Sequence, residues 1–234
     1  MRLASWLLLS VLSVSLVAQE TPIVADRPGF ADGSGTVGAG TVQLEVGVTL
    51  DDGDDSVLSL PTLLRWGLSD AFELRFESDV LRSTGGDREI APFGAGFKLR
   101  LCEGEAPLSL LASIEIPSGE GASKATQFGT EVRLVSDLDL GGGYSLTPNV
   151  GLALAEGGET SAVVAASLGK EVGNAAPFVD FELRAGQGKP SMVVDGGIAW
   201  IVRNETQLDI AGGVIVAGDD SSDWFLTAGI SRRF

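Results

Sequence analysis

Apolar and polar residues alternate with period two along most of this chain, and this pattern constrains the fold more than any other feature. Segment 41–50 reads TVQLEVGVTL, with valine or leucine at every second position. Segments 72–81, 96–101 and 178–184 repeat the pattern, with charged residues on the opposite parity. Because successive side chains of a strand point to opposite faces, each segment predicts a β-strand with one apolar and one polar face.

Turn signals rich in glycine and aspartate separate these segments, for example DDGDD at 51–55 and GGG at 141–143. Breaks at such signals predict about twelve strands, an even number as in bacterial single-chain barrels, although a count of about ten stays open. We expect the strands at 39–50, 56–67, 72–81, 90–101, 107–117, 127–138, 144–155, 160–171, 176–185, 191–202, 206–217 and 223–234.

The aromatic residues favour a closed antiparallel transmembrane β-barrel over a soluble periplasmic β-sandwich, which is the alternative. A sandwich places aromatics in mid-strand, where its core is thickest. Here most fall near strand ends, as in the two interfacial girdles of a membrane barrel whose termini both face the periplasm. The predicted girdle residues are Trp66, Phe72, Tyr144, Phe178, Trp200, Trp224 and Phe234.

The first residues have the layout of a secretion signal. A short charged start precedes an apolar run over 6–17, and Ala18 offers a small residue for cleavage. The run is too short for a membrane helix, so we predict a cleaved signal peptide, with an uncleaved anchor as the alternative. The predicted domains are the signal peptide at 1–18, an N-terminal segment at 19–38 and a barrel at 39–234, in the outer membrane of a Gram-negative bacterium.

The composition argues against several functions. The net charge of −16 disfavours nucleic acid as a partner, which requires a basic surface. The chain has no histidine, the usual base of a serine hydrolase, and its single cysteine, Cys102, allows no internal disulfide. Carboxylate pairs such as Glu73 with Glu77 also fit a polar lumen lining, so we predict no enzymatic activity and no cofactor.

The polar faces of the strands are predicted to line the barrel lumen. Arg65, Arg75, Lys98 and Arg100 fall beside an acidic row in 72–81. Opposite charges on adjacent strands pair across a ladder, so a salt-bridged, closed interior and a conducting path both stay open. In a conducting path the acidic excess would favour cations or neutral solutes. The predicted lumen residues are Glu45, Arg65, Glu73, Arg75, Glu77, Asp79, Lys98, Arg100, Glu131, Arg133, Asp180, Glu182, Arg184, Asp195 and Asp209.

Two further features leave alternatives open. Residues 19–38 could fold into the lumen as a plug with Phe30 inserted, or form a disordered periplasmic tail. Two acidic loops would be adjacent if the first and last strands pair, and their carboxylates could hold a divalent cation. Solvated turns explain these loops better, because they lack an ordered ligand spacing, and no metal is predicted. The weak metal candidates are Asp51, Asp52, Asp54, Asp55, Asp219 and Asp220.

Several short motifs together resemble a known family. They are Asp26-Arg-Pro-Gly-Phe30 followed by GTVQLE at 40–45, LRWGLSD at 64–70 with FELR at 72–75, DGGIAW at 195–200, QLD at 207–209 and the Arg-Phe ending. Together these motifs resemble the outer-membrane barrel family labelled "MetA-pathway of phenol degradation". The resemblance implies a transporter-like barrel for hydrophobic or aromatic compounds and supplies no catalytic residues.

We therefore expect an outer-membrane barrel for passive or facilitated transport of small hydrophobic or aromatic compounds. The alternative is a closed structural barrel with a salt-bridged lumen and no transport. The expected partners are outer-membrane lipid, a small-molecule solute and the barrel-assembly machinery, because Phe234 resembles the terminal aromatic that this machinery reads.

Overall fold

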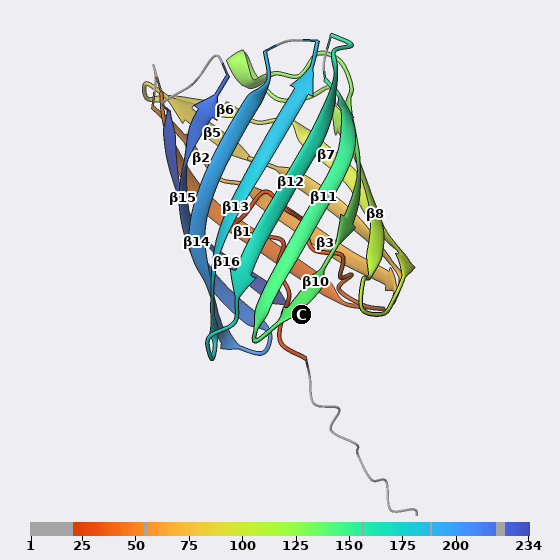
Figure 1. The fold of residues 1–234 in the computed structure, drawn as a ribbon. Coiled ribbons are helices and arrows are strands. Elements are labelled where there is room, and N and C mark those ends of the chain that lie inside the picture. Colours follow the sequence, from red (N-terminus) through yellow and green to blue (C-terminus); the bar gives the residue numbers. More distant parts are fainter. Residues whose placement is uncertain (1–20, 54–55, 156, 188, 219–222) are drawn as a thin grey trace, which may run out of the picture.

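A closed antiparallel barrel makes up most of the chain (Figure 1). The computed structural model describes residues 21–53, 56–155, 157–187, 189–218 and 223–234. Within these ranges twelve strands form the wall, which closes because β16 pairs with β1 from Gln43↔Arg233 to Asp52↔Trp224. The wall strands are β1 (Val42–Asp52), β3 (Thr62–Ser69), β4 (Phe72–Ser78), β7 (Phe93–Cys102), β8 (Leu108–Ile116), β9 (Gly129–Ser136), β11 (Tyr144–Leu154), β12 (Thr160–Lys170), β13 (Ala175–Gly186), β14 (Ser191–Arg203), β15 (Thr206–Ala217) and β16 (Trp224–Arg233).

The predicted twelve-stranded closed barrel is confirmed, and the open count of ten is wrong. The signal peptide predicted at 1–18 lies outside the described residues. No helix among the described residues is long and apolar enough to cross a membrane.

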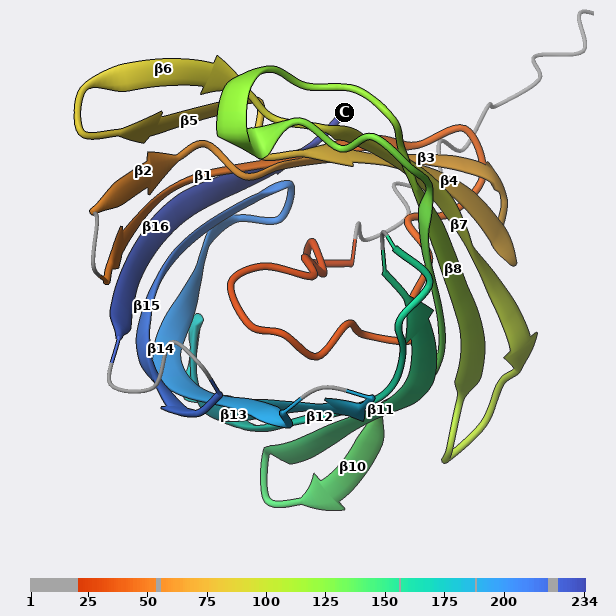
Figure 2. The same cartoon turned by 90° about the horizontal axis from the view of Figure 1, so that it is seen from above.

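Four short strands lie outside the ring, and Figure 2 shows them beside it: β2 (Val57–Ser59), β5 (Leu81–Thr84), β6 (Asp87–Ile90) and β10 (Leu138–Gly141). The second, third and fourth predicted strands, expected to be continuous, are therefore interrupted. Pro61 and Pro92 stand at two of the breaks, where proline has no N–H for the ladder. Val80, at the third, has φ +49°, which is incompatible with an extended strand. The 3₁₀ turn η1 (Gly121–Ser123) lies against β6.

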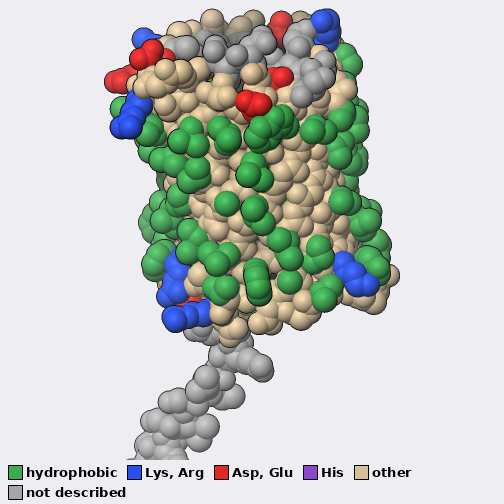
Figure 3. Space-filling model, turned by 90° about the vertical axis from the view of Figure 1, so that its left-hand side faces the viewer, with side chains coloured by type: hydrophobic (Ala, Val, Ile, Leu, Met, Phe, Trp, Pro, Cys, Tyr) green, Lys and Arg blue, Asp and Glu red, His purple; other side chains and the backbone are tan. Residues whose placement is uncertain are grey.

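The two faces of the wall differ in chemistry, as the alternation requires. On β16, Trp224, Leu226 and Ile230 point outward and are 42–47% exposed, whereas Thr227 and Ser231 point inward and are buried. The other wall strands repeat this sidedness. Figure 3 shows hydrophobic side chains over the middle of the outer face, with charged side chains at its two ends. This is the surface of a barrel whose solvent is lipid.

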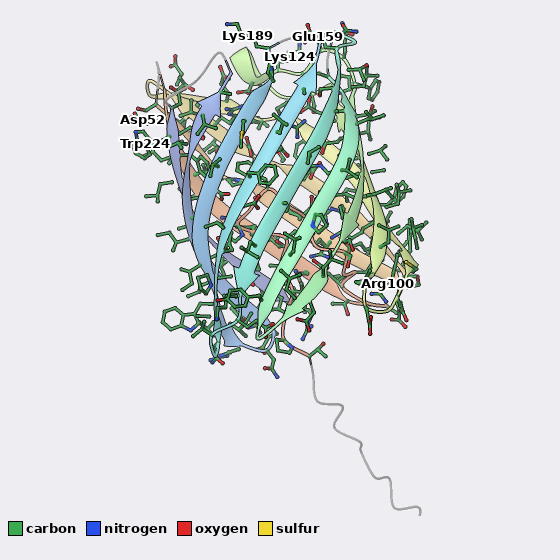
Figure 4. All side chains as sticks on the ribbon, viewed as in Figure 1. Asp52, Arg100, Lys124, Glu159, Lys189 and Trp224 are labelled. Carbon is green, nitrogen blue, oxygen red and sulfur yellow. The ribbon has the colours of Figure 1, made fainter. Side chains whose placement is uncertain are left out.

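Both described ends of the chain lie at one end of the barrel, which we call the terminal end. The Arg233 guanidinium there donates a 2.6 Å hydrogen bond to the carbonyl oxygen of Thr21. Arg100 lies toward the same end, whereas Asp52, Lys124 and Glu159 lie at the opposite end, which we call the loop end (Figure 4). Between the ends, residues 21–41, which we call the N-terminal segment, run inside the ring of strands (Figure 2).

Candidate functional site: the barrel interior

The N-terminal segment has no strand ladder, so its backbone polar groups need other partners. Inward-facing side chains from the wall supply many of them. This arrangement joins an irregular segment to strands that are far apart in the sequence, and it places the charged residues of the wall in a defined network.

Asp26 of the N-terminal segment lies at the centre of a buried cluster, which we call the Asp26 hub. It comprises Asp26, the cations Arg65, Arg75 and Lys98, and the wall carboxylates Glu45 and Glu73. The Lys98 ammonium donates to both carboxylate oxygens of Asp26, at 2.9 and 3.2 Å. Arg65 Nη1 lies 3.3 Å from Asp26 Oδ2, and Arg75 donates a hydrogen bond to the same oxygen. Three donors from β3, β4 and β7 thus converge on one carboxylate.

The strand register explains why the hub needs this carboxylate. Arg65 and Arg75 are directly opposite each other on β3 and β4, and like charges in that position repel. Glu73 accepts two hydrogen bonds from Arg65, at 2.9 and 3.1 Å, and one from Arg75. Lys98 is 0% exposed and has no carboxylate but Asp26 within ion-pair distance among the described residues. Because an unpaired buried ammonium is costly, Asp26 compensates a charge that the wall leaves open.

The same surroundings set the acidity of Asp26. Burial alone would raise the pKa of this carboxyl group, but the positive charges of Arg65, Lys98 and Arg75 outweigh that effect. The pKa of Asp26 is therefore held well below its usual value. Asp26 carries its negative charge throughout the physiological pH range.

Arg27 occupies a slot in the wall between β1 and β16. Its guanidinium donates to Asp209 Oδ1 at 3.1 Å and to Thr227 Oγ1 at 3.0 Å. Gly47 and Gly229 are paired across the two strands, and a Cβ atom at either position would come within 2.6 Å of the guanidinium group. The two glycines therefore make the space that Arg27 fills.

Phe30 and Ala31 are fixed from the opposite side of the lumen. Both of their N–H groups donate to Asp180 Oδ2, at 2.9 and 3.1 Å, and Arg133 Nη1 donates to the carbonyl oxygen of Phe30 at 3.0 Å. The ring of Phe30 makes an edge-to-face contact with Phe225, with 5.8 Å between centroids. The side chain predicted to insert into the lumen therefore packs against an inward-facing aromatic of β16.

The remainder of the segment is held by paired polar contacts. The N–H of Asp32 donates to Asn149 Oδ1, and Asn149 Nδ2 donates to the carbonyl oxygen of Asp32, both at 2.9 Å. Ser34 donates twice to Asp137 Oδ2 at 2.7 Å. Glu73 accepts from the Val37 N–H at 2.8 Å, which joins this part of the segment to the Asp26 hub.

Three cavities lie around the N-terminal segment. The loop-end cavity, about 580 Å³, is lined by Glu77, Asp79, Glu115 and Lys124 among others. The terminal-end cavity, about 760 Å³, lies between the segment and β11–β15. A middle cavity of about 330 Å³ shares Arg27 with the loop-end cavity and residues 26–29 with the terminal-end cavity. Residues 26–29 thus form part of the partition between the two halves of the lumen.

The structure places the predicted lumen residues on the inward face, but it separates them into groups. One group is the hub, and a second joins Arg133, Arg184, Glu131 and Glu182 in ion pairs. Arg100, expected to cluster with Arg65, Arg75 and Lys98 beside the acidic row of 72–81, instead pairs with Glu103 at 2.8 Å and donates to Thr36. Asp209 serves the Arg27 slot, Asp180 serves Phe30 and Ala31, and Glu77 and Asp79 line the loop-end cavity.

Among the described residues, Asp195 is a buried inward carboxylate without the polar contacts that the hub carboxylates have. It lies directly opposite Asp180 on the neighbouring strand and is 4% exposed. Neither of its carboxylate oxygens has a hydrogen-bond partner within the described part of the chain.

The predicted aromatic girdle needs one correction. Phe178 shares the inward parity of Asp180 on β13, lines the terminal-end cavity and lies beside Gly29, so it cannot belong to an outer girdle. The error came from using distance to the strand end and ignoring parity. The structure places the others on the outer face: Trp66, Phe72, Tyr144, Trp200 and Trp224 on strands and Phe234 beyond β16.

The acidic loops are only partly described. Asp51 and Asp52 lie on β1, directly opposite Phe225 and Trp224 of β16. Asp54, Asp55, Asp219 and Asp220 lie outside the described residues. Among the residues that are described, no group of three or more potential metal ligands comes together.

Sequence reasoning named many of the wall charges that hold the segment, such as Arg65, Lys98 and Asp180, but it missed the charged residues of the segment that they bind. It predicted that Phe30 inserts into the lumen but gave no such role to Asp26 or Arg27, although both stand in the DRPGF motif. The signal available was that Asp26, Arg27 and Asp32 are the only charged residues in the sequence of 21–41. Inward polar residues such as Gln43 and Asn149 also escaped, because uncharged side chains do not stand out in an alternating strand.

The closed wall, the apolar exterior and the charged interior define an outer-membrane β-barrel. Solved structures with the same fold include the COG4313 outer membrane channel from Pseudomonas putida F1, with a TM-score of 0.65 and 13% identity over 88% of this chain and 99% of that chain. The NanC porin has a TM-score of 0.60 with 8% identity, covering 81% of this chain and 98% of that chain. The KdgM porin has a TM-score of 0.59 with 10% identity, covering 81% and 99%.

At these identities the likeness shows a shared fold. No protein-family model matches the sequence, and no curated protein matches it. The resemblance to the phenol-degradation family label therefore stays a prediction.

Proposed function

We propose that this barrel is an outer-membrane channel for small, largely apolar or aromatic solutes, and that its N-terminal segment is a plug that controls passage. The observation that carries the proposal is the partition. Residues 26–29 line both the middle and the terminal-end cavities, so a solute crossing the lumen has to pass the segment. The proposal assigns the terminal end to the periplasm.

The lining of the cavities supports the solute class. Phe30, Phe225, Pro28 and Leu63 border the middle cavity, and Ile23 and Phe178 border the terminal-end cavity. Aromatic and aliphatic surfaces with a few polar groups are typical of sites for small, mainly apolar ligands. The shared fold with a channel and two porins is consistent with a role in passage.

The second candidate is a closed structural barrel without transport. The observation that favours it is the number of charged contacts between the segment and the wall. Asp26 and Arg27 of the segment form ion pairs with wall residues, and Asp180 of the wall accepts from the backbone of the segment. A plug held this firmly would stabilise the barrel whether or not anything passes. The two candidates differ in whether the segment ever leaves its position.

A disulfide between plug and wall separates the candidates. A Cβ atom at Gly29 would lie 3.4 Å from Asp180 Cγ, so cysteines at positions 29 and 180 are close enough to join, in a Cys102→Ser background. We expect oxidation of this variant to lower ion conductance in planar bilayers and solute-driven swelling of liposomes, and reduction to restore both. The matched control is Asp180→Cys alone in the same background, which also lacks the Asp180 carboxylate but cannot form the disulfide, so it should not respond to oxidation. Equal, negligible flux in both redox states would favour the structural barrel.

A further inference from the structure

The formal charges of the Asp26 hub do not balance within the wall. The wall contributes the three cations Arg65, Arg75 and Lys98 but only the two carboxylates Glu45 and Glu73. The N-terminal segment supplies negative charge through Asp26, which pairs with all three cations, and through Asp32, which pairs with Arg75 at 3.0 Å. If the segment leaves, the wall keeps one uncompensated positive charge that faces the lumen and attracts a new anion.

We propose that the hub is a carboxylate-binding site, which Asp26 fills when the plug is in place and which a solute monocarboxylate fills when the plug is displaced. This inference rests on the proposed gating role and names the solute class. The hub offers what a carboxylate needs: donors from three strands that reach both oxygens of Asp26, from side chains that are at most 6% exposed. Hydrogen bonds between charged partners of this kind are the strong ones.

The wall carboxylates do not make the hub a cation site. Glu45 accepts from the backbone N–H groups of Asp26 and Arg27 and from Gln43 and Arg65. Glu73 is held by Arg65, Arg75 and the Val37 N–H. With the segment displaced, Glu45 keeps the wall donors Gln43 and Arg65, and Glu73 keeps Arg65 and Arg75. Both wall carboxylates therefore stay paired, and the free capacity of the hub is for an anion.

The space beside the hub suits an apolar body on the carboxylate. Asp26 and Arg75 both line the middle cavity, whose wall side includes Pro61, Leu63 and Phe225. A molecule with its carboxylate between Arg75 and Lys98 could place an aromatic or aliphatic group against these side chains. The inferred solutes are therefore amphiphilic monocarboxylates such as aromatic acids.

The test is chemical rescue of the missing carboxylate. In the full mature chain refolded in detergent, we expect Asp26→Ala to bind benzoate at least roughly tenfold more tightly than the unmodified protein, because Asp26 no longer competes for the donors. The neutral analogue benzamide should not bind. Asp26→Asn, which keeps the shape of the side chain, serves as a second variant if the alanine protein does not fold, with the same expected gain.

Matched variants locate the effect. Asp32→Ala removes another carboxylate of the segment, one that pairs with Arg75 at 3.0 Å, but it leaves Asp26 on all three cations. Its gain in benzoate binding should therefore be much smaller than that of Asp26→Ala. Asp139→Ala changes an exposed carboxylate on β10 and should behave like the unmodified protein. Lys98→Met combined with Asp26→Ala should abolish the gain. Equal binding of benzoate and benzamide, or an equal gain in Asp32→Ala, would overturn the site.

Flux measurements keep this inference distinct from the proposed gating. Benzoate should raise the conductance of the unmodified protein as it competes with Asp26, whereas benzamide should not. If Asp26→Ala binds benzoate but no condition opens the barrel, the carboxylate site stands and the gating proposal fails. If the oxidised and reduced plug variants differ in flux but no Asp26 variant binds benzoate, gating stands and the carboxylate site fails.

Discussion

Gly47 has a specific role, because the guanidinium of Arg27 lies where its side chain would be. A Cβ atom at this position would come within 2.4 Å of both terminal nitrogens of Arg27, which are the far end of a flexible side chain. In contrast, a Cβ atom at Gly229 would also collide with the carbonyl oxygen of Val46, 2.7 Å away, and so would strain the wall itself. Position 47 therefore offers a way to disturb the plug without disturbing the barrel.

We expect Gly47→Ala to displace Arg27 from Asp209 and Thr227 and so to weaken plug docking by about 1–3 kcal/mol, the usual cost of losing hydrogen bonds to a charged group. Conductance in planar bilayers should rise, while heat-modifiable migration of the folded barrel stays unchanged. Gly35→Ala is the control, since no atom lies within 4 Å of a Cβ added there. An identical conductance in the two variants would contradict the role of the slot.

The depressed pKa of Asp26 gives a dependence on pH with a defined sign. Burial opposes ionisation of this carboxyl group, but Arg65, Lys98 and Arg75 hold its pKa well below the usual value. A group whose pKa is lowered on docking contributes stability above its undocked value, about 3.9, and loses this contribution as the pH falls through the docked value. Docking through Asp26 should therefore be constant from neutral pH to about 4 and weaken only below it.

The comparison of the unmodified protein with Asp26→Asn isolates this group from the other carboxylates of the lumen. The difference in thermal stability between the two should be constant from pH 7 down to about 4 and then shrink. A difference that instead shrank between pH 7 and pH 5 would show that Asp26 does not have the lowered pKa.

At the scale of the strands, the pairing of β13 with β14 contains an unfavourable contact. Asp180 and Asp195 face each other at inward positions, and only Asp180 is held by the plug. Like charges directly opposite each other destabilise a strand pair. We expect Asp195→Asn to stabilise the barrel by roughly 0.2–1 kcal/mol, measured by urea-induced unfolding in lipid vesicles.

Asp209→Asn provides the matched comparison for this prediction. It makes the same chemical change on the next strand, β15, but it breaks the ion pair with Arg27 at 3.1 Å, so it should destabilise. If Asp195→Asn raises the stability of the barrel and Asp209→Asn lowers it, the repulsion within the wall is separated from the attraction to the plug. Destabilisation by both would mean that Asp195 has a favourable partner.

The strand pattern of this chain could be predicted because period two is a local property. The apolar residues of 41–50 alternate without interruption, those of 223–234 do so up to Arg232, and β1 and β16 follow these segments closely. The breaks at Pro61, Val80 and Pro92 were not predicted. The residue pattern read there as continuous strands, although the strands themselves end at these positions. Phe178 was misplaced for a related reason, since its parity was known but was not applied.

The contacts of the plug could not be predicted from local pattern. Asp26 meets Arg65, Arg75 and Lys98 through an irregular segment that has no periodicity to fix its register. The sequence indicated the cations and their neighbouring strands, but the partner that balances them lies outside the barrel strands. The net charge of −16 suggested a lumen that favours cations or neutral solutes. The wall of the hub instead carries one excess positive charge, so the net charge of the chain did not predict the local charge of this site.

At the scale of the whole molecule, the barrel separates two solvents, and each face of every strand belongs to one of them. Val164 points outward near the middle of β12, whereas Ser167, three residues further, points inward and lines the terminal-end cavity. Lipid cannot solvate an ammonium group near the bilayer centre, but a polar lumen can. The same substitution at these two positions should therefore have very different costs.

We expect Val164→Lys to destabilise the barrel by about 2–4 kcal/mol in lipid vesicles, the cost of a lysine at the midplane of an outer-membrane barrel. Ser167→Lys should be tolerated, because Ser167 lies directly opposite Asp180 and the added ammonium would face a carboxylate. Unfolding both variants in vesicles and again in a mild detergent measures this contrast. Equal costs at the two positions in lipid would contradict a membrane exterior, and with it any channel whose passage depends on the plug inside.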